Sequence, residues 1–156
     1  MNFLFAFTLC LTIGPTLQAA RVHDLASSNR QPVRPNLVVI MADDLGYRDL
    51  GCYGCIDFQT PNIDRLAQRG IRCTNGYVSH PYCSPSRAGV LSGRYQQTFG
   101  HESNPPYNEK NSEIGIDPAT RLLPDLFQQA GYVTGLIGKW HLGAGQPFRP
   151  NRRGFT

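Results

Sequence analysis

Strand-like runs alternate with helix-like segments along this chain after residue 35. The runs cover residues 36–41, 71–77 and 132–137, and the first and last are rich in valine, isoleucine or threonine. Each has strand length, and turn-forming residues lie at its boundaries. Apolar runs that alternate with helices are typical of parallel strands buried on both faces. The pattern therefore predicts an α/β fold with a mainly parallel sheet covered by helices on both faces.

Three segments carry helix signals. Thr60 is a capping residue, proline follows it in the first turn, and Gly70 is placed to stop the helix. The expected helices span residues 61–68, 86–91 and 122–130. A chain of 156 residues with 40% hydrophobic content can bury one core of ordinary domain size.

Residues 94–120 form a long polar segment that is interrupted by Pro105-Pro106. A loop of this length inside a domain is usually functional, so we expect it to form a wall of the substrate pocket. His101 lies in this loop, and His80 lies just before the second expected helix. We interpret both histidines as structural.

The sequence Cys83-Ser84-Pro85-Ser86-Arg87 combines a nucleophile, a helix start and a fixed cation. Serine and proline favour the first turn of a helix, which places Cys83 at a helix N-terminus. The free N–H groups and the dipole there stabilise an anionic nucleophile. Arg87 lies four residues later, on the same helical face. An isolated cysteine is more often a buried structural residue, so the interpretation of Cys83 as a nucleophile depends on the helix start and the arginine beside it.

Other nucleophile and phosphate motifs are excluded by spacing. A cysteine phosphatase loop requires arginine where this chain has Gly89, and the papain signature is absent. The serine-hydrolase elbow fails because Leu91 stands at the nucleophile position. A phosphate-binding loop at Lys139 fails because Trp140 follows it.

Two further polar clusters each follow a strand-like run. Asp43 and Asp44 come after the first run, where α/β proteins place ligands, and their hard oxygens suit calcium or magnesium. Lys139 and His141 come after the last run, and residues two apart share one face of an extended chain. Taken alone, the two aspartates could form a turn or a helix cap, and the lysine and histidine could be solvated and structural.

The segment from Cys83 to Arg94 matches the pattern C-x-P-S-R-x-x-x-L-[TS]-G-R at every specified position. It resembles the signature of the type I sulfatases, and residues 35–46, 60–67 and 138–143 resemble other segments of that family in order and spacing. The resemblance is greatest to the branch of arylsulfatases A and B and N-acetylgalactosamine-6-sulfatase. It implies an alkaline phosphatase-like α/β/α sandwich, of which this chain would be the N-terminal part.

The resemblance also implies a reaction, the hydrolysis of a sulfate ester to an alcohol and inorganic sulfate. A maturation enzyme would oxidise Cys83 to formylglycine, whose hydrate is the nucleophile. Asp43 and Asp44, together with the modified Cys83, would bind Ca²⁺, with Mg²⁺ as an alternative. The resemblance assigns contacts with the sulfate or the nucleophile to the side chains of Arg87, Lys139 and His141. The substrate would be a sulfated small molecule or a glycan.

Two other functions remain compatible with the same residues. A phosphate or phosphonate monoesterase of the same superfamily would use the same nucleophile position and metal. A noncatalytic secreted module could keep the fold and bind anions.

The domain organisation expected from the sequence has three parts. Residues 1–20 resemble a signal peptide, because an apolar run too short to span a bilayer ends in small residues, although its start lacks Lys and Arg. Residues 21–34 form a flexible leader, and residues 35–156 form the start of the catalytic domain. We expect an exported protein without stable membrane insertion. Family members are longer and carry further metal and sulfate ligands downstream, so this chain alone is expected to be truncated and inactive.

Charge and cysteine content exclude other classes. The net charge is +4, and no basic patch with interleaved aromatic residues is present, so nucleic-acid binding is not expected. Cys52 and Cys55 form a C-x-x-C motif without a second half, which disfavours a zinc site. Three cysteines lie outside the expected signal peptide and the signature, namely Cys52, Cys55 and Cys73. Because three is an odd number, at most one disulfide can form among them.

Overall fold

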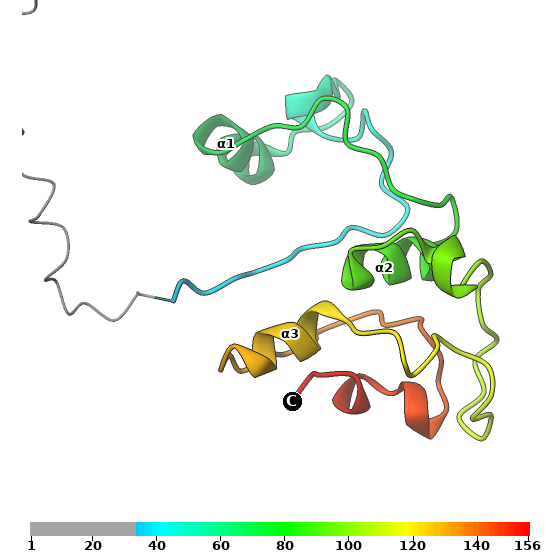
Figure 1. Cartoon of the computed structure of the whole chain (residues 1–156). Helices are drawn as coiled ribbons and strands as arrows, with labels where there is room; N and C mark the ends of the chain where they lie inside the picture. Colours follow the sequence, from blue (N-terminus) through cyan, green and yellow to red (C-terminus); the bar gives the residue numbers. More distant parts are fainter. Residues whose placement is uncertain (1–33) are drawn as a thin grey trace, which may run out of the picture. The chain divides into compact units, whose positions relative to one another are not determined.

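The computed structural model describes residues 34–156, and all of its helices lie within residues 41–156 (Figure 1). Residues 34–40 belong to a separate unit and form an exposed segment without regular secondary structure. The α-helices are α1 (Pro61–Arg69), α2 (Cys83–Ser92) and α3 (Leu123–Gln129). The short 3₁₀ helices are η2 (Gly51–Tyr53), η3 (Gln96–Phe99), η4 (Gln146–Phe148) and η5 (Pro150–Arg152).

The prediction of strands at 36–41, 71–77 and 132–137 is wrong for the described structure, because residues 34–156 contain no β-strand. A strand requires a neighbour that pairs with its N–H and C=O groups, and none of the three runs pairs with another. The last run still shows a period of two in its burial. Val133 and Ile137 are exposed, whereas Thr134 and Leu136 are partly buried. The apolar pattern therefore predicted neither the missing pairing nor the exposure of one face of this run.

Helix α1 begins directly after Thr60, as predicted, but this threonine bonds differently from an ordinary cap. Its hydroxyl accepts from the N–H of Gly51 at 2.8 Å and donates to Asp64 Oδ1 at 3.0 Å. The same Asp64 oxygen accepts from the N–H of Cys52 at 2.7 Å. Gly70 follows the last residue of the helix with φ −120°, so it does not use the left-handed conformation open to glycine. These bonds connect η2 to α1.

The signature helix begins earlier than predicted. Helix α2 starts at Cys83 rather than Ser86, after the extended residue Tyr82. It ends at Ser92, and the residue that follows, Gly93, has a left-handed φ of 64°. Its existence and the position of Cys83 at its N-terminus are confirmed.

Helix α3 is confirmed at the predicted place, one residue shorter at each end. Its first turn is held by Asp125, whose Oδ2 accepts from the N–H of Leu122 at 2.9 Å. Gly131 follows the helix with φ 81°, a conformation that favours glycine.

A small core connects α2 to the segment that follows α3. Helices α2 and α3 are in contact, and the N–H of Ile116 donates to the carbonyl of Leu142 at 2.9 Å. Trp140 packs against the core and donates through its indole N–H to the carbonyl of Phe148 at 2.8 Å. The fully buried apolar residues of this cluster are Ala88, Ile116, Leu122 and Leu142. These contacts hold residues 139–142 beside α2, where the polar residues of both meet.

The expected signal peptide and almost all of the leader lie outside the described residues. Within residues 34–156, no helix is both long and apolar enough to cross a membrane.

Candidate active site

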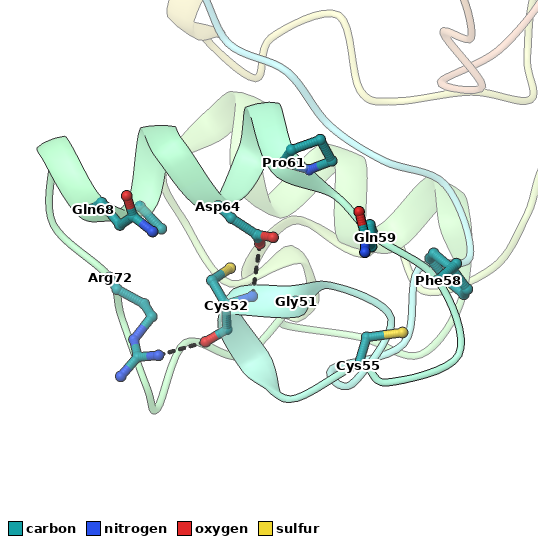
Figure 2. A pocket seen from close by; sticks show the side chains of 10 residues that line it. Gly51, Cys52, Cys55, Phe58, Gln59, Pro61, Asp64, Gln68 and Arg72 are labelled. Atoms are coloured by element: carbon teal, nitrogen blue, oxygen red, sulfur yellow. Dashed lines mark hydrogen bonds between the residues drawn. The ribbon is translucent and has the colours of Figure 1, made fainter.

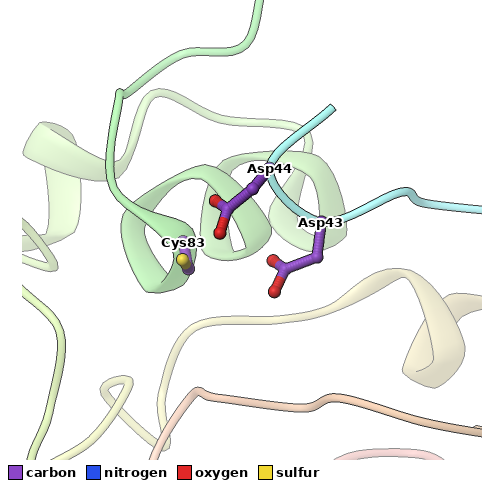
Figure 3. Close-up of side chains that lie close together, drawn as sticks. All are labelled: Asp43, Asp44 and Cys83. Atoms are coloured by element: carbon purple, nitrogen blue, oxygen red, sulfur yellow. The ribbon is translucent and has the colours of Figure 1, made fainter. Parts of the chain in front are cut away.

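Asp43, Asp44 and Cys83 converge in space although the aspartates are far from the cysteine in sequence (Figure 3). One ligand atom from each lies within 4.8 Å of the others. Among the His, Cys, Asp and Glu side chains of residues 34–156, these three lie close enough together to hold a metal ion. Cys83 is a partly buried free thiol at the first position of α2. The nucleophile position and the predicted metal ligands therefore share one site.

Asp43 links this group to two cations. Its Oδ2 lies 2.7 Å from Lys139 Nζ, and its Oδ1 lies 3.2 Å from Arg87 Nη2. The hydrogen bond from Lys139, and secondly that from Arg87, hold the pKa of the Asp43 carboxyl below its usual value. The bond to Asp43 in turn raises the pKa of Lys139. Both charges are therefore present at neutral pH beside the nucleophile position.

Arg87 is the buried element of this network. Its residue is 9% exposed, and its Nη1 donates to the carbonyl of Lys139 at 2.6 Å. The planar guanidinium thus bonds both Asp43 and the backbone carbonyl of Lys139, which a point-like ammonium cannot do in the same geometry.

This geometry leads to a stability prediction. In the full-length protein, Arg87→Lys is expected to lower the free energy of unfolding by about 1–3 kcal/mol, because one buried charged hydrogen bond is lost. The urea midpoint measures the effect. Arg149→Lys is the matched control, since the Arg149–Glu109 pair spans 3.5 Å between exposed side chains. That control should change stability by less than about 0.5 kcal/mol, and an equal effect of the two substitutions would contradict the assigned role of Arg87.

His141 is held in an unusual backbone conformation. Its φ is 67° and that of Asp44 is 56°, and these are the non-glycine residues with positive φ in the described part of the chain. Both are predicted site residues, and backbone strain of this kind is concentrated at functional sites. The Nδ1 atom of His141 is buried without a hydrogen-bond partner. Burial, and then the charges of Lys139 and Arg87, lower the pKa of this imidazole, which is therefore neutral at pH 7 and able to exchange a proton.

The donor atoms fit a hard divalent cation. Asp43 and Asp44 contribute carboxylate oxygens, which such a cation prefers, whereas the sulfur of Cys83 beside them is a softer donor. Calcium takes six to eight oxygen ligands, so the described residues supply only part of such a shell.

The structure gathers all six predicted site residues in one region, and it adds residues that sequence analysis did not select. His101, which we interpreted as structural, is 7% exposed and lies with Nε2 2.6 Å from Ser84 Oγ. Asn104 accepts from the N–H of Ser84 at 2.9 Å. No short-range pattern could reveal these contacts, because they join residues 17 and 20 positions apart.

A pocket beside α1 and η2 contains none of the predicted site residues (Figure 2). Cys52 and Cys55 line it as free thiols, and their side chains point in different directions. Its polar lining includes Asp64 and Arg72, both of which bond Cys52 through its backbone.

The chain belongs to the sulfatase family, whose profile matches residues 35–156. It is 42% identical to human N-acetylgalactosamine-6-sulfatase over 136 residues, which are 83% of this chain and 26% of that protein. It is 46% identical to the N-acetylgalactosamine-6-O-sulfatase of Bacteroides thetaiotaomicron over 112 residues, which are 72% of this chain and 21% of the relative. The chain thus spans about a quarter of the length of these relatives.

Solved structures agree with this membership. The crystal structure of Ps i-CgsB superposes with a TM-score of 0.68 at 42% identity, covering 74% of this chain and 25% of the other. A structure named BT4656, in complex with its substrate D-glucosamine-2-N,6-O-disulfate, superposes with a TM-score of 0.63 at 39% identity, covering 74% and 22%. These matches support the predicted alkaline phosphatase-like architecture, although the described residues themselves contain no strand.

Proposed function

We propose that this chain carries the nucleophile and part of the metal site of an exported sulfatase, which hydrolyses a sulfate ester to an alcohol and inorganic sulfate. The observation that carries the proposal is the convergence of Asp43, Asp44 and Cys83 within 4.8 Å, with Lys139 and Arg87 bonded to Asp43. Family membership supports a sulfate ester as the substrate.

Two groups would complete the chemistry. Formylglycine, made from Cys83 by a maturation enzyme, would supply as its hydrate the oxygen nucleophile that attacks sulfur. Calcium, held by Asp43, Asp44 and the modified residue, would stabilise negative charge on that oxygen and polarise a sulfate oxygen.

The roles of the other three side chains, Lys139, Arg87 and His141, follow from their charge. Lys139 stays protonated beside Asp43 and the Cys83 side chain, so it is placed to attract a sulfate oxygen. Arg87 keeps Asp43 oriented and holds the backbone of residue 139. His141 is neutral at pH 7, and its imidazole can hold or return a proton of the nucleophile.

We further propose a sulfated sugar as the substrate. The named relatives are N-acetylgalactosamine-6-sulfatases, and one matching structure holds D-glucosamine-2-N,6-O-disulfate. Another matching structure, of Ps i-CgsB, is in complex with k-i-k-neocarrahexaose.

The test compares 4-nitrophenyl sulfate with 4-nitrophenyl phosphate as substrates of the full-length protein, co-expressed with a maturation enzyme. We expect kcat/KM for the sulfate to exceed that for the phosphate by at least about 100-fold, an order of discrimination that interactions made only in the transition state can provide. A preference for phosphate would indicate the phosphomonoesterase alternative. Binding of sulfated sugars without turnover of either ester would indicate the noncatalytic alternative.

A further inference from the structure

The loop at residues 101–116 touches both halves of the candidate site. At one end of this loop, His101 and Asn104 contact Ser84, the residue that follows Cys83. At the other end, the N–H of Ile116 donates to the carbonyl of Leu142, the residue that follows His141. The loop therefore connects the turn that carries the nucleophile to the turn that carries the imidazole.

The first turn of α2 has no cap of its own. Tyr82 occupies the N-cap position and makes no side-chain hydrogen bond to the helix. Asn104 takes over this task, because its Oδ1 accepts from the N–H of Ser84 at 2.9 Å. The orientation of the residue at the helix start thus depends on a side chain from the loop.

His101 provides the second contact with this turn. Ser84 is fully buried, and its Oγ lies 2.6 Å from His101 Nε2. Burial lowers the pKa of the His101 imidazole, so the ring is neutral at pH 7. One proton joins the Ser84 hydroxyl and Nε2, whichever of the two donates it, so this contact pairs both buried groups.

We propose that His101 is a positioning residue, which fixes Cys83 relative to His141 by anchoring Ser84 to the loop at residues 101–116. The proposal rests on the function proposed above for Cys83 and His141. His101 does not touch the reacting atoms; it acts through Ser84 at one end of the loop, and the bond from Ile116 to Leu142 holds the other end beside His141. The strained backbone of His141 and its unpartnered Nδ1 make such support necessary, since small displacements at a reacting centre reduce the rate strongly.

The kinetic test uses the full-length matured protein and 4-nitrophenyl sulfate. His101→Ala is expected to lower kcat by about 10- to 100-fold with KM changed less than about threefold, because positioning affects the chemical step. His101→Gln, whose amide oxygen can accept from Ser84, should recover part of kcat. Glu102→Gln, in the exposed neighbouring residue, is the control and should leave kcat unchanged.

A double-mutant cycle separates this role from general destabilisation. If His101 acts through Ser84, the variant that combines His101→Ala with Ser84→Ala should lose little more kcat than His101→Ala alone. Additive losses, or an unchanged kcat in His101→Ala, would overturn the proposal.

A spectroscopic readout keeps the test independent of turnover. In ¹⁵N spectra of the histidine rings, His101 is expected as a neutral ring, and Ser84→Ala should shift its Nε2 resonance. An unchanged Nε2 resonance would overturn the role of Ser84 even if the protein lacked sulfatase activity. Absence of turnover combined with the expected spectra would instead count against the proposed function alone.

Discussion

Cys83→Ala is expected to reduce hydrolysis of an aryl sulfate by at least about 1,000-fold, because the substitution removes the side chain that we propose as the source of the nucleophile. The fold should persist. Cys83 is a partly buried residue at the first position of α2, where alanine is tolerated, and it forms no disulfide. The measurement is turnover of 4-nitrophenyl sulfate by the full-length matured protein, with the thermal midpoint recorded for each variant.

The matched control for this substitution is Cys73→Ala. Cys73 is an exposed free thiol, and the hydroxyl of Tyr53 bonds its backbone carbonyl rather than its sulfur. Activity of the control should therefore equal that of the unchanged protein. Near-normal turnover in Cys83→Ala would show that another residue is the nucleophile.

Asp43→Asn is expected to weaken Ca²⁺ binding by at least about 100-fold, because an anionic ligand of a hard cation becomes neutral. The substitution also removes the charge that pairs with Lys139 at 2.7 Å and with Arg87 at 3.2 Å. Two cations would then face the site without their counter-ion, which further disfavours a dication there. Isothermal titration of the full-length protein with CaCl₂, after removal of metal with EDTA, measures the affinity.

Asp57→Asn provides the comparison for the metal experiment. Asp57 is an exposed aspartate outside the group formed by Asp43, Asp44 and Cys83, and the substitution makes the same chemical change. Its effect on Ca²⁺ affinity should stay within about twofold, since distant exposed charges are screened. If Asp43→Asn bound Ca²⁺ as tightly as this control, Asp43 would not be a metal ligand.

Local signals predicted the helices well. Proline after Thr60 located the start of α1, and Gly131 lies just after α3. The serine–proline pair after Cys83 predicted α2 but placed its start three residues too late, at Ser86 rather than Cys83. These signals act within one turn of the chain, so the sequence contains all the information they need. The strands could not be predicted in the same way, because a strand depends on a partner that lies elsewhere. Residues 132–137 keep the alternating burial of a strand without one.

The candidate site could also be predicted only in part. The pattern from Cys83 to Arg94 was sufficient to predict the family, and the profile match over residues 35–156 confirmed it. The positions of Lys139 and His141 next to a strand-like run suggested that they act together. The left-handed backbone of His141 was not predictable, because the run suggested an extended conformation at that point.

By itself, the sequence determined the family, the presence of the three helices and the residue types that the chemistry requires, because each of these depends on neighbours along the chain. Only the tertiary structure decided that Asp43 bonds both Lys139 and Arg87, and that His101 is buried against Ser84. The physical reason is that such contacts join residues brought together by packing of α2, α3 and the loops around them, and no local pattern specifies which polar groups will meet there.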